Sequence, residues 1–172
     1  MERDYLDFLR EAKTIPDNIS IKMVNPSQVL DEFLSLWIDH INFVNKIQNF
    51  SYKNATTKMA KYKFEKALKQ YPKAHVLFAA YDKDKMVGYV QVGIDNRGRA
   101  HGQIISFHLL EKYRRGGIGS RLITDALNWL WSNGAKEIEL GTQGGNEAAV
   151  AFYKRHGFEI QGYTLRHKKS KY

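Results

Sequence analysis

The fold is decided by the stretch Leu109–Ser120, which reads LLEKYRRGGIGS. This stretch predicts a strand end that passes through glycines directly into a helix. A helix N-terminus carries unpaired backbone N–H groups and a partial positive charge, and glycines let a phosphate approach the backbone. Arg114 and Arg115 add positive charge. The stretch therefore indicates an anion site, although a glycine-rich turn without a ligand would carry the same residues.

Two better-known phosphate-binding motifs do not fit this stretch. A Walker loop needs Gly-x-x-x-x-Gly-Lys-Ser/Thr, and no Lys-Ser/Thr pair follows these glycines. The dinucleotide pattern Gly-x-Gly-x-x-Gly begins at Gly117 and Gly119 but has Leu122 where its third glycine belongs. The pattern that fits is Arg/Gln-x-x-Gly-x-Gly/Ala, present as RRGGIG over Arg114–Gly119.

The residues before this stretch predict helices first and strands afterwards. Ser27 can cap a helix of apolar residues at helical spacing, and Pro72 ends a second helix. β-rich runs separated by short polar turns follow, and they predict an antiparallel meander. The expected elements are a short helix over 3–13, a strand over 19–24, helices over 27–48 and 56–71, and strands over 75–81, 86–94 and 102–110.

The residues after the glycines alternate between helix and strand patterns. We expect a helix over 117–132, a strand over 136–141, a helix over 146–156 and a strand from Phe158. The whole order predicts a mixed α/β sheet with helices on both faces. The 172 residues suit one domain, with 1–18 as an N-terminal helical extension and 166–172 as a basic tail.

A second motif lies at 146–158 and reads NEAAVAFYKRHGF. Asn146 and Tyr153 are almost two helical turns apart, so both project from one side of the expected helix and can serve one ligand. Taken alone, Asn146 could be only a helix cap and Tyr153 only a core aromatic.

The two motifs together make the sequence similar to the GNAT acetyltransferases, over about residues 19–165 in element order. The resemblance implies the GNAT fold, a central, mixed, mostly antiparallel sheet that splays apart between its fourth and fifth strands. It implies that the loop amides hold the pyrophosphate of coenzyme A, that the fourth strand pairs with the pantetheine arm, and that the helix side chains complete the site. The implied binding residues are Phe107, His108, Leu109, Arg114, Arg115, Gly116, Gly117, Ile118, Gly119, Ser120, Asn146 and Tyr153.

The implied activity is transfer of the acetyl group of acetyl-CoA to a primary amine of a small molecule or peptide. The chain has no cysteine to carry an acetyl group, so we expect direct attack by the amine, with a Ser or Lys intermediate as the alternative. By the resemblance, Tyr153 protonates the departing thiolate, and a backbone N–H near Leu109 stabilises the oxyanion. A module that binds acetyl-CoA as a sensor without catalysis is the alternative.

The general base is not evident in the sequence. Many members of the family place a Glu near the end of the fifth strand, where this chain has Gly141. Glu139, Ser106 and His108 are the candidates that remain. The acceptor is expected between the helical pair and the splayed strands, near Trp37, Asp39, His40 and Phe43, with Asp31 and Glu32 on the same helix.

Composition limits the other classes. The absence of cysteine excludes disulfides and thiolate metal sites, His75, His101 and His156 lack metal-site spacing, and no apolar run reaches the length of a spanning helix. We therefore expect no metal, no membrane contact and a cytoplasmic location. The net charge of +9 permits nucleic-acid binding, but no signature supports it. After Leu165 only a short basic segment remains, so either the seventh strand common in the family is vestigial or a second copy covers the sheet edge, as a homodimer.

Overall fold

Five strands form one sheet in the chain order β1-β2-β3-β4-β5. The first four pair antiparallel, and β5 runs parallel to β4. The computed structural model describes residues 14–48, 55–71, 75–95 and 100–165. The strands are β1 (Ile19–Val24), β2 (His75–Asp82), β3 (Lys85–Asp95), β4 (His101–Leu109) and β5 (Glu137–Leu140). The mixed, mostly antiparallel sheet that the sequence predicted is thereby confirmed.

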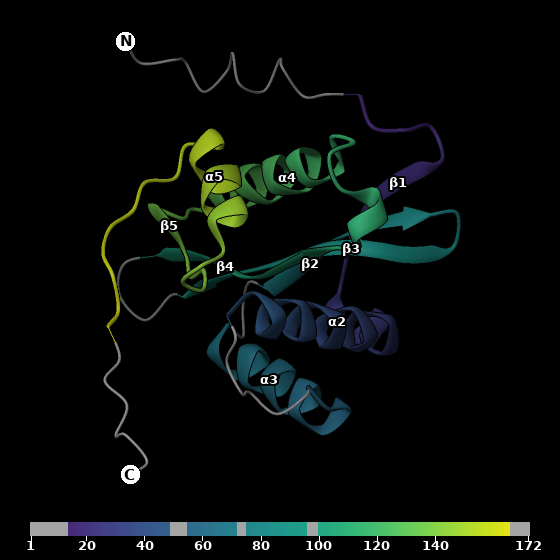
Figure 1. Ribbon diagram of the computed structural model, residues 1–172, viewed down its shortest axis with the longest axis horizontal. Helices are drawn as coiled ribbons and strands as arrows, with labels where there is room; N and C mark the ends of the chain where they lie inside the picture. Colours follow the sequence, from purple (N-terminus) through teal and green to yellow (C-terminus); the bar gives the residue numbers. More distant parts are fainter. Residues whose placement is uncertain (1–13, 49–54, 72–74, 96–99, 166–172) are drawn as a thin grey trace.

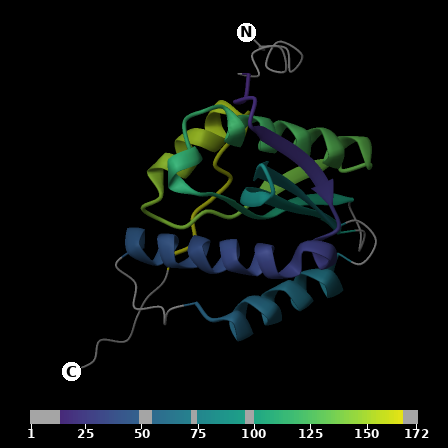
Figure 2. The same ribbon diagram turned by 90° about the vertical axis from the view of Figure 1, so that its right-hand side faces the viewer.

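Helices cover both faces of this sheet, as predicted. Figures 1 and 2 show α2 and α3 against one face and α4 and α5 against the other. The bounds are η1 (Pro26–Val29), α2 (Leu30–Gln48), α3 (Thr57–Gln70), η2 (Glu111–Tyr113), α4 (Ile118–Ser132) and α5 (Glu147–Arg155). No helix in these ranges combines the length and the apolarity needed to cross a membrane.

The central strands β2 and β3 are buried almost along their whole length because both of their faces are covered. Their side chains contribute to two apolar clusters, one under α4 and one under α2 and α3. In the second cluster the rings of Phe33 and Tyr89 meet edge to face, with centroids 4.9 Å apart. This packing fixes α2 against β3 and thus sets the position of the α2 side chains that face β4.

The start of the first helical segment differs from the prediction. The Asn25 Oδ1 atom, not Ser27, caps it and accepts a hydrogen bond of 2.9 Å from the Ser27 backbone N–H. Pro26 occupies the first helical position, where its missing N–H costs nothing, so the cap must lie one residue earlier. Thr56 caps α3, at the boundary that the sequence predicted.

Two irregularities of β4 shape the region beyond the sheet centre. β5 pairs with β4 only from His101 to Ile104, so the rest of β4 extends past the parallel ladder. On the other side, Gln91 pairs with Ser106 and Val92 pairs with Ile104, which leaves Ile105 as a bulge. The fourth and fifth strands are thus joined only at one end.

The prediction of a strand from Phe158 is wrong. Residues 158–165 form no strand, and the side chains of Tyr163 and Leu165 are 84% and 93% exposed. An alternating sequence becomes a strand only against a partner, and this segment pairs with none of the described strands. The expected helix over 3–13 and the basic tail at 166–172 lie outside the described residues.

Candidate functional site

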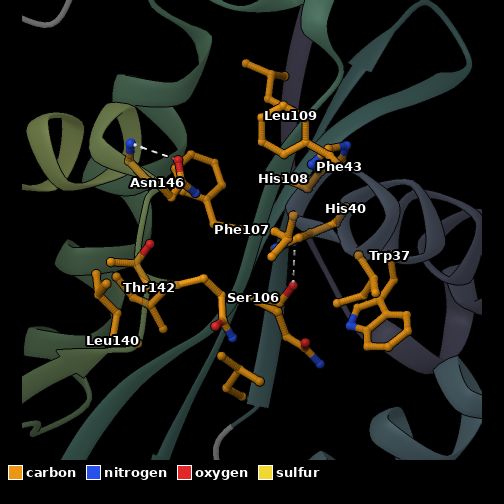
Figure 3. Close-up of a pocket in the computed structure, with 18 of the residues that line it drawn as sticks. Trp37, His40, Phe43, Ser106, Phe107, His108, Leu109, Leu140, Thr142 and Asn146 are labelled. Carbon is orange, nitrogen blue, oxygen red and sulfur yellow. Dashed lines mark hydrogen bonds between the residues drawn. The ribbon is translucent and has the colours of Figure 1, made fainter. Parts of the chain in front are cut away.

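A single cavity of about 1440 Å³ extends from the glycine-rich loop, along β4, to α3. Its side chains form two groups on either side of β4 (Figure 3), with Leu140, Thr142 and Asn146 on one side and Trp37, His40 and Phe43 on the other. All the binding residues expected from the sequence line this cavity except Gly116, which is exposed, and Ile118, which is buried in the core.

The glycine-rich loop turns the end of β4 into α4. Arg115 and Gly117 have positive φ angles of 68° and 84°, and α4 begins at Ile118 with no side chain capping it. Its first N–H groups are therefore available to an anion. Gly119 faces the cavity, where a Cβ atom would add bulk to the wall at the start of the helix.

The Arg114 side chain is turned back onto the strand end. Its Nε atom donates a hydrogen bond of 2.8 Å to the Leu109 carbonyl, and its guanidinium lies 4.3 Å from the centre of the Phe43 ring. Arg114 thus ties the loop to β4 and α2 while it contributes positive charge to the cavity.

Asn146 and Tyr153 both face the cavity from the α5 side, as their spacing predicted. The Asn146 Oδ1 atom caps α5 by accepting a hydrogen bond of 3.3 Å from the Ala149 backbone N–H, so its amide nitrogen stays a donor. The Tyr153 ring contacts Phe107 and Phe158, and burial raises the pKa of its hydroxyl. Tyr153 is therefore a protonated phenol at neutral pH.

On the opposite side of β4, α2 meets Ser106 and His108. The His108 Nε2 atom donates to Asp39 Oδ2 at 2.8 Å, and the rings of His40 and His108 stack with centroids 5.3 Å apart. Ser106 Oγ shares a hydrogen bond of 2.8 Å with the Tyr89 hydroxyl and lies 3.5 Å from His40 Nδ1 (Figure 3). These groups form a connected polar cluster in an otherwise apolar wall.

Both histidines of this cluster are neutral at physiological pH. Burial, then the nearby His108 and Arg114, lowers the pKa of His40 to about 4 against the opposing effect of Asp39. Burial also lowers the pKa of His108, with a smaller contribution from Arg114, while the hydrogen bond and charge of Asp39 act to raise it. A neutral imidazole has one nitrogen with a free lone pair, so each ring can accept a proton.

A second polar group lines the α3 end of the cavity, and sequence reasoning did not single it out. Gln70 Nε2 donates to the Tyr71 hydroxyl at 2.9 Å, and this hydroxyl donates to Gln103 Oε1 at 2.7 Å. Gln91 is buried nearby, with its Nε2 atom 2.8 Å from His75 Nε2. A glutamine inside the apolar run of β3 was the signal that could have revealed this group, because buried polar residues are uncommon.

The structure shows which of the acidic residues expected near the site line the cavity. Glu139 points to His101, with 2.9 Å between Oε2 and Nε2, and does not line the cavity. Asp31 and Glu32 are exposed and do not line it either. Gly141 lines it without a side chain, and no Asp or Glu of the described ranges lines it. Within those ranges, no three His, Asp or Glu side chains gather as a metal site would require.

Comparisons with known proteins agree with this arrangement. Residues 41–158 match the acetyltransferase (GNAT) family. N-alpha-acetyltransferase 30 of Schizosaccharomyces pombe is 34% identical over 108 residues, which are 62% of this chain and 71% of that protein. N-alpha-acetyltransferase 50 of Danio rerio is 36% identical over 83 residues, so the match spans 47% of this chain and about half, 49%, of that relative.

The fold has solved counterparts. The structure of aminoglycoside N-acetyltransferase AAC(6')-Iy in complex with CoA covers 88% of this chain and 94% of its own, with a TM-score of 0.64 at 16% identity. At that identity the likeness concerns the fold alone. The family match covers the loop, β4 and α5, which are among the elements that line the cavity. The chain therefore belongs to the GNAT acetyltransferase family and is an acetyl-CoA-dependent N-acetyltransferase.

Proposed function

We propose that this protein transfers the acetyl group of acetyl-CoA directly to a primary amine, and that its preferred acceptor is the α-amino group of a polypeptide. The observation that carries the proposal is one continuous cavity with an uncapped helix N-terminus at one end and neutral polar groups at the other. The names of the relatives, N-alpha-acetyltransferases 30 and 50, support the choice of acceptor.

The residues present fit coenzyme A on the loop side. The uncapped amides at the start of α4 and the positive charge of Arg115 suit a pyrophosphate. β4 beyond Ile104 has no β5 partner, so its backbone groups suit an extended amide-bearing arm. Asn146 offers a donor across the gap. Acetyl-CoA supplies the activated acyl group, and these residues bind and orient it.

Tyr153 is the proposed acid for the departing thiolate. Its hydroxyl is protonated, buried and part of the cavity wall, and a thiolate gains from a positioned proton donor. Backbone N–H groups near Leu109, at the splayed end of β4, are the proposed oxyanion donors. Direct attack needs no residue of the chain to carry the acetyl group, in keeping with the absence of cysteine.

The test is release of free thiol from acetyl-CoA with three acceptors: a peptide with a free N-terminus, an N-terminally blocked peptide with one lysine, and an aminoglycoside. We expect the first peptide to be turned over best and Tyr153→Phe to lower kcat by about 10²-fold. Tyr163→Phe, which removes the hydroxyl of an 84% exposed tyrosine, is the matched control.

Each result is decisive. Acetyl-CoA binding without thiol release on any amine would favour the sensor function, for which the bare Gly141 position is the supporting feature. Preference for the aminoglycoside would overturn the proposed acceptor but not the proposed transfer. A homodimer and a cytoplasmic location remain predictions from the sequence.

A further inference from the structure

We propose that His108, held in place by Asp39, accepts the proton that the acceptor amine must lose before it attacks. This inference rests on the proposed function and deepens it, because it names the proton acceptor and thereby the class of amine that the site can use.

Few of the groups that line the cavity can accept a proton at neutral pH. The described lining includes no carboxylate, and its cationic side chains, Lys63, Lys66, Arg114, Arg115 and Arg155, have no lone pair while charged. Of the lining tyrosines, Tyr153 has a pKa that burial raises, and the Tyr71 hydroxyl donates its proton to Gln103 Oε1. His40 and His108 remain as the lining groups that are neutral bases near pH 7.

The two histidines differ in their hydrogen-bond partners. Asp39 is an acceptor only, so the contact of 2.8 Å fixes the proton of His108 on Nε2 and leaves the lone pair on Nδ1. The carboxylate also stabilises the imidazolium that forms when Nδ1 takes a proton. Within the described part of the chain, His40 makes its side-chain contact with the Ser106 hydroxyl and not with a carboxylate, and burial lowers its pKa to about 4, which makes it the weaker base.

Charged and titratable groups from three elements face His108. On α2 these are Asp39 and the stacked ring of His40, and on the loop the guanidinium of Arg114. From β3, Tyr89 reaches the cluster through Ser106 and stays neutral because burial raises its pKa. Among the residues that the structure describes, Asp39 is thus the negative group whose charge acts on His108. Its side chain is 58% exposed while that of His108 is 3% exposed, so the pair links the cavity to solvent.

The proton balance follows. One proton leaves the bound ammonium for His108 Nδ1. The imidazolium releases it again from Nδ1 to water once the product has left, which restores the neutral ring with its Nε2 proton hydrogen-bonded to Asp39. The neutral nitrogen attacks the thioester carbonyl carbon, the C–N bond forms and the C–S bond breaks. The second proton, which the new amide nitrogen loses, replaces the one that Tyr153 gives to the thiolate. The products are the acetylated amine and coenzyme A as a thiol.

The acceptor class follows from the strength of this base. A neutral histidine takes a proton readily from an α-ammonium, whose pKa is about 7.7 to 8.0, and poorly from a lysine side chain near 10.4. At pH 7 the neutral fraction of an α-amine is about 230 to 420 times larger than that of a lysine side chain. The site therefore favours amines that lose their proton close to neutrality.

The experiment is the pH profile of kcat/KM for a peptide with a free N-terminus, at saturating acetyl-CoA. Asp39→Asn keeps the shape of the side chain but removes its charge, so we expect a loss of about 10- to 100-fold and an acid limb that moves to lower pH. Asp31→Asn, on the same helix and away from the cavity, is the control and should match the wild type. Acetyl-CoA affinity should be equal in all three.

A second variant guards against a folding defect. His108→Gly should lose activity, and added imidazole should restore at least part of it, which a purely structural histidine would not allow. An unchanged acid limb in Asp39→Asn, or an active His108→Gly without imidazole, overturns the inference while leaving the proposed transfer intact. A wild type that releases no thiol with any amine overturns both.

Discussion

The Tyr71 hydroxyl donates a hydrogen bond of 2.7 Å to Gln103 Oε1 and so joins the end of α3 to the part of β4 that lines the cavity. This bond leaves the amide nitrogen of Gln103 as a donor for whatever occupies the α3 end. The contact spans 32 residues of sequence, and it orients a neutral polar group at the acceptor side of the cavity.

Tyr71→Phe removes this hydroxyl and frees the Gln103 amide to rotate. Because one hydrogen bond contributes about 0.5–1.5 kcal/mol, we expect the KM for the acceptor to rise about 2- to 10-fold. The KM for acetyl-CoA should stay constant. Steady-state kinetics on both substrates measures the effect, and Tyr62→Phe, a 62% exposed tyrosine on the same helix, is the control. Equal acceptor KM values in both variants would contradict a role of Gln103 in acceptor binding.

Gly119→Ala should weaken acetyl-CoA binding without unfolding the protein. An added Cβ would lie 3.6 Å from Phe152 and 3.7 Å from Phe107, which are ordinary contacts. It would, however, narrow the wall where we place the pyrophosphate, so we expect the KM for acetyl-CoA to rise about tenfold, equivalent to about 1.4 kcal/mol. Gly116→Ala, three residues earlier, meets nothing within 4 Å and should leave this KM unchanged. The opposite order of the two variants would move the anion site elsewhere.

Gly93→Ala should destabilise the fold. Its Cβ would lie 2.6 Å from Cγ of Tyr71, a residue that is only 3% exposed and has little room to move. Overpacking of this kind costs about 1–3 kcal/mol, measurable as a lower free energy of unfolding in urea. Gly162→Ala, in open space, is the control. If Tyr71 is the cause, the loss should shrink when Gly93→Ala is combined with Tyr71→Ala.

Stability should fall on mild acidification because of His75. Burial lowers the pKa of His75 to about 4, below the unfolded value of 6.5, so the unfolded chain binds its proton first. The contribution is complete above pH 6.5 and is lost as the pH falls towards 4. At pH 5 the loss is about 2 kcal/mol. Urea unfolding at pH 7 and pH 5 should show a smaller difference for His75→Gln than for the wild type. An identical difference would mean that other groups account for the acid sensitivity.

The parts of this protein that local sequence determines were predicted well. The glycine-rich loop and the start of α4 depend on backbone geometry and charge within a few residues, and so does the Asn146 cap of α5. Helical spacing also placed Asn146 and Tyr153 on one cavity wall. Such features require no knowledge of distant partners.

The features that depend on distant partners could not be predicted. The His108–Asp39 contact joins residues 69 positions apart, and its formation depends on how α2 packs over β4. Glu139 had the right residue type, but its side chain contacts His101 at the start of β4 and does not line the cavity. The segment after Phe158 has the alternation of a strand and forms none, because a strand also needs a neighbour.

The bulge at Ile105 determines which side chains of β4 lie on the same face of the strand. In a regular strand, Gln103 and Ser106 would face opposite sides, since they are an odd number of residues apart. With Ile105 inserted, Gln103 reaches Tyr71 on the α3 side and Ser106 reaches His40 on the α2 side, so both face the same helical layer. The extra residue thus places Gln103 and Ser106 on the same face of β4, toward the helices that line the acceptor side of the cavity. Deletion of Ile105 would turn the side chains of half the strand to the opposite face, although the composition of the strand would hardly change.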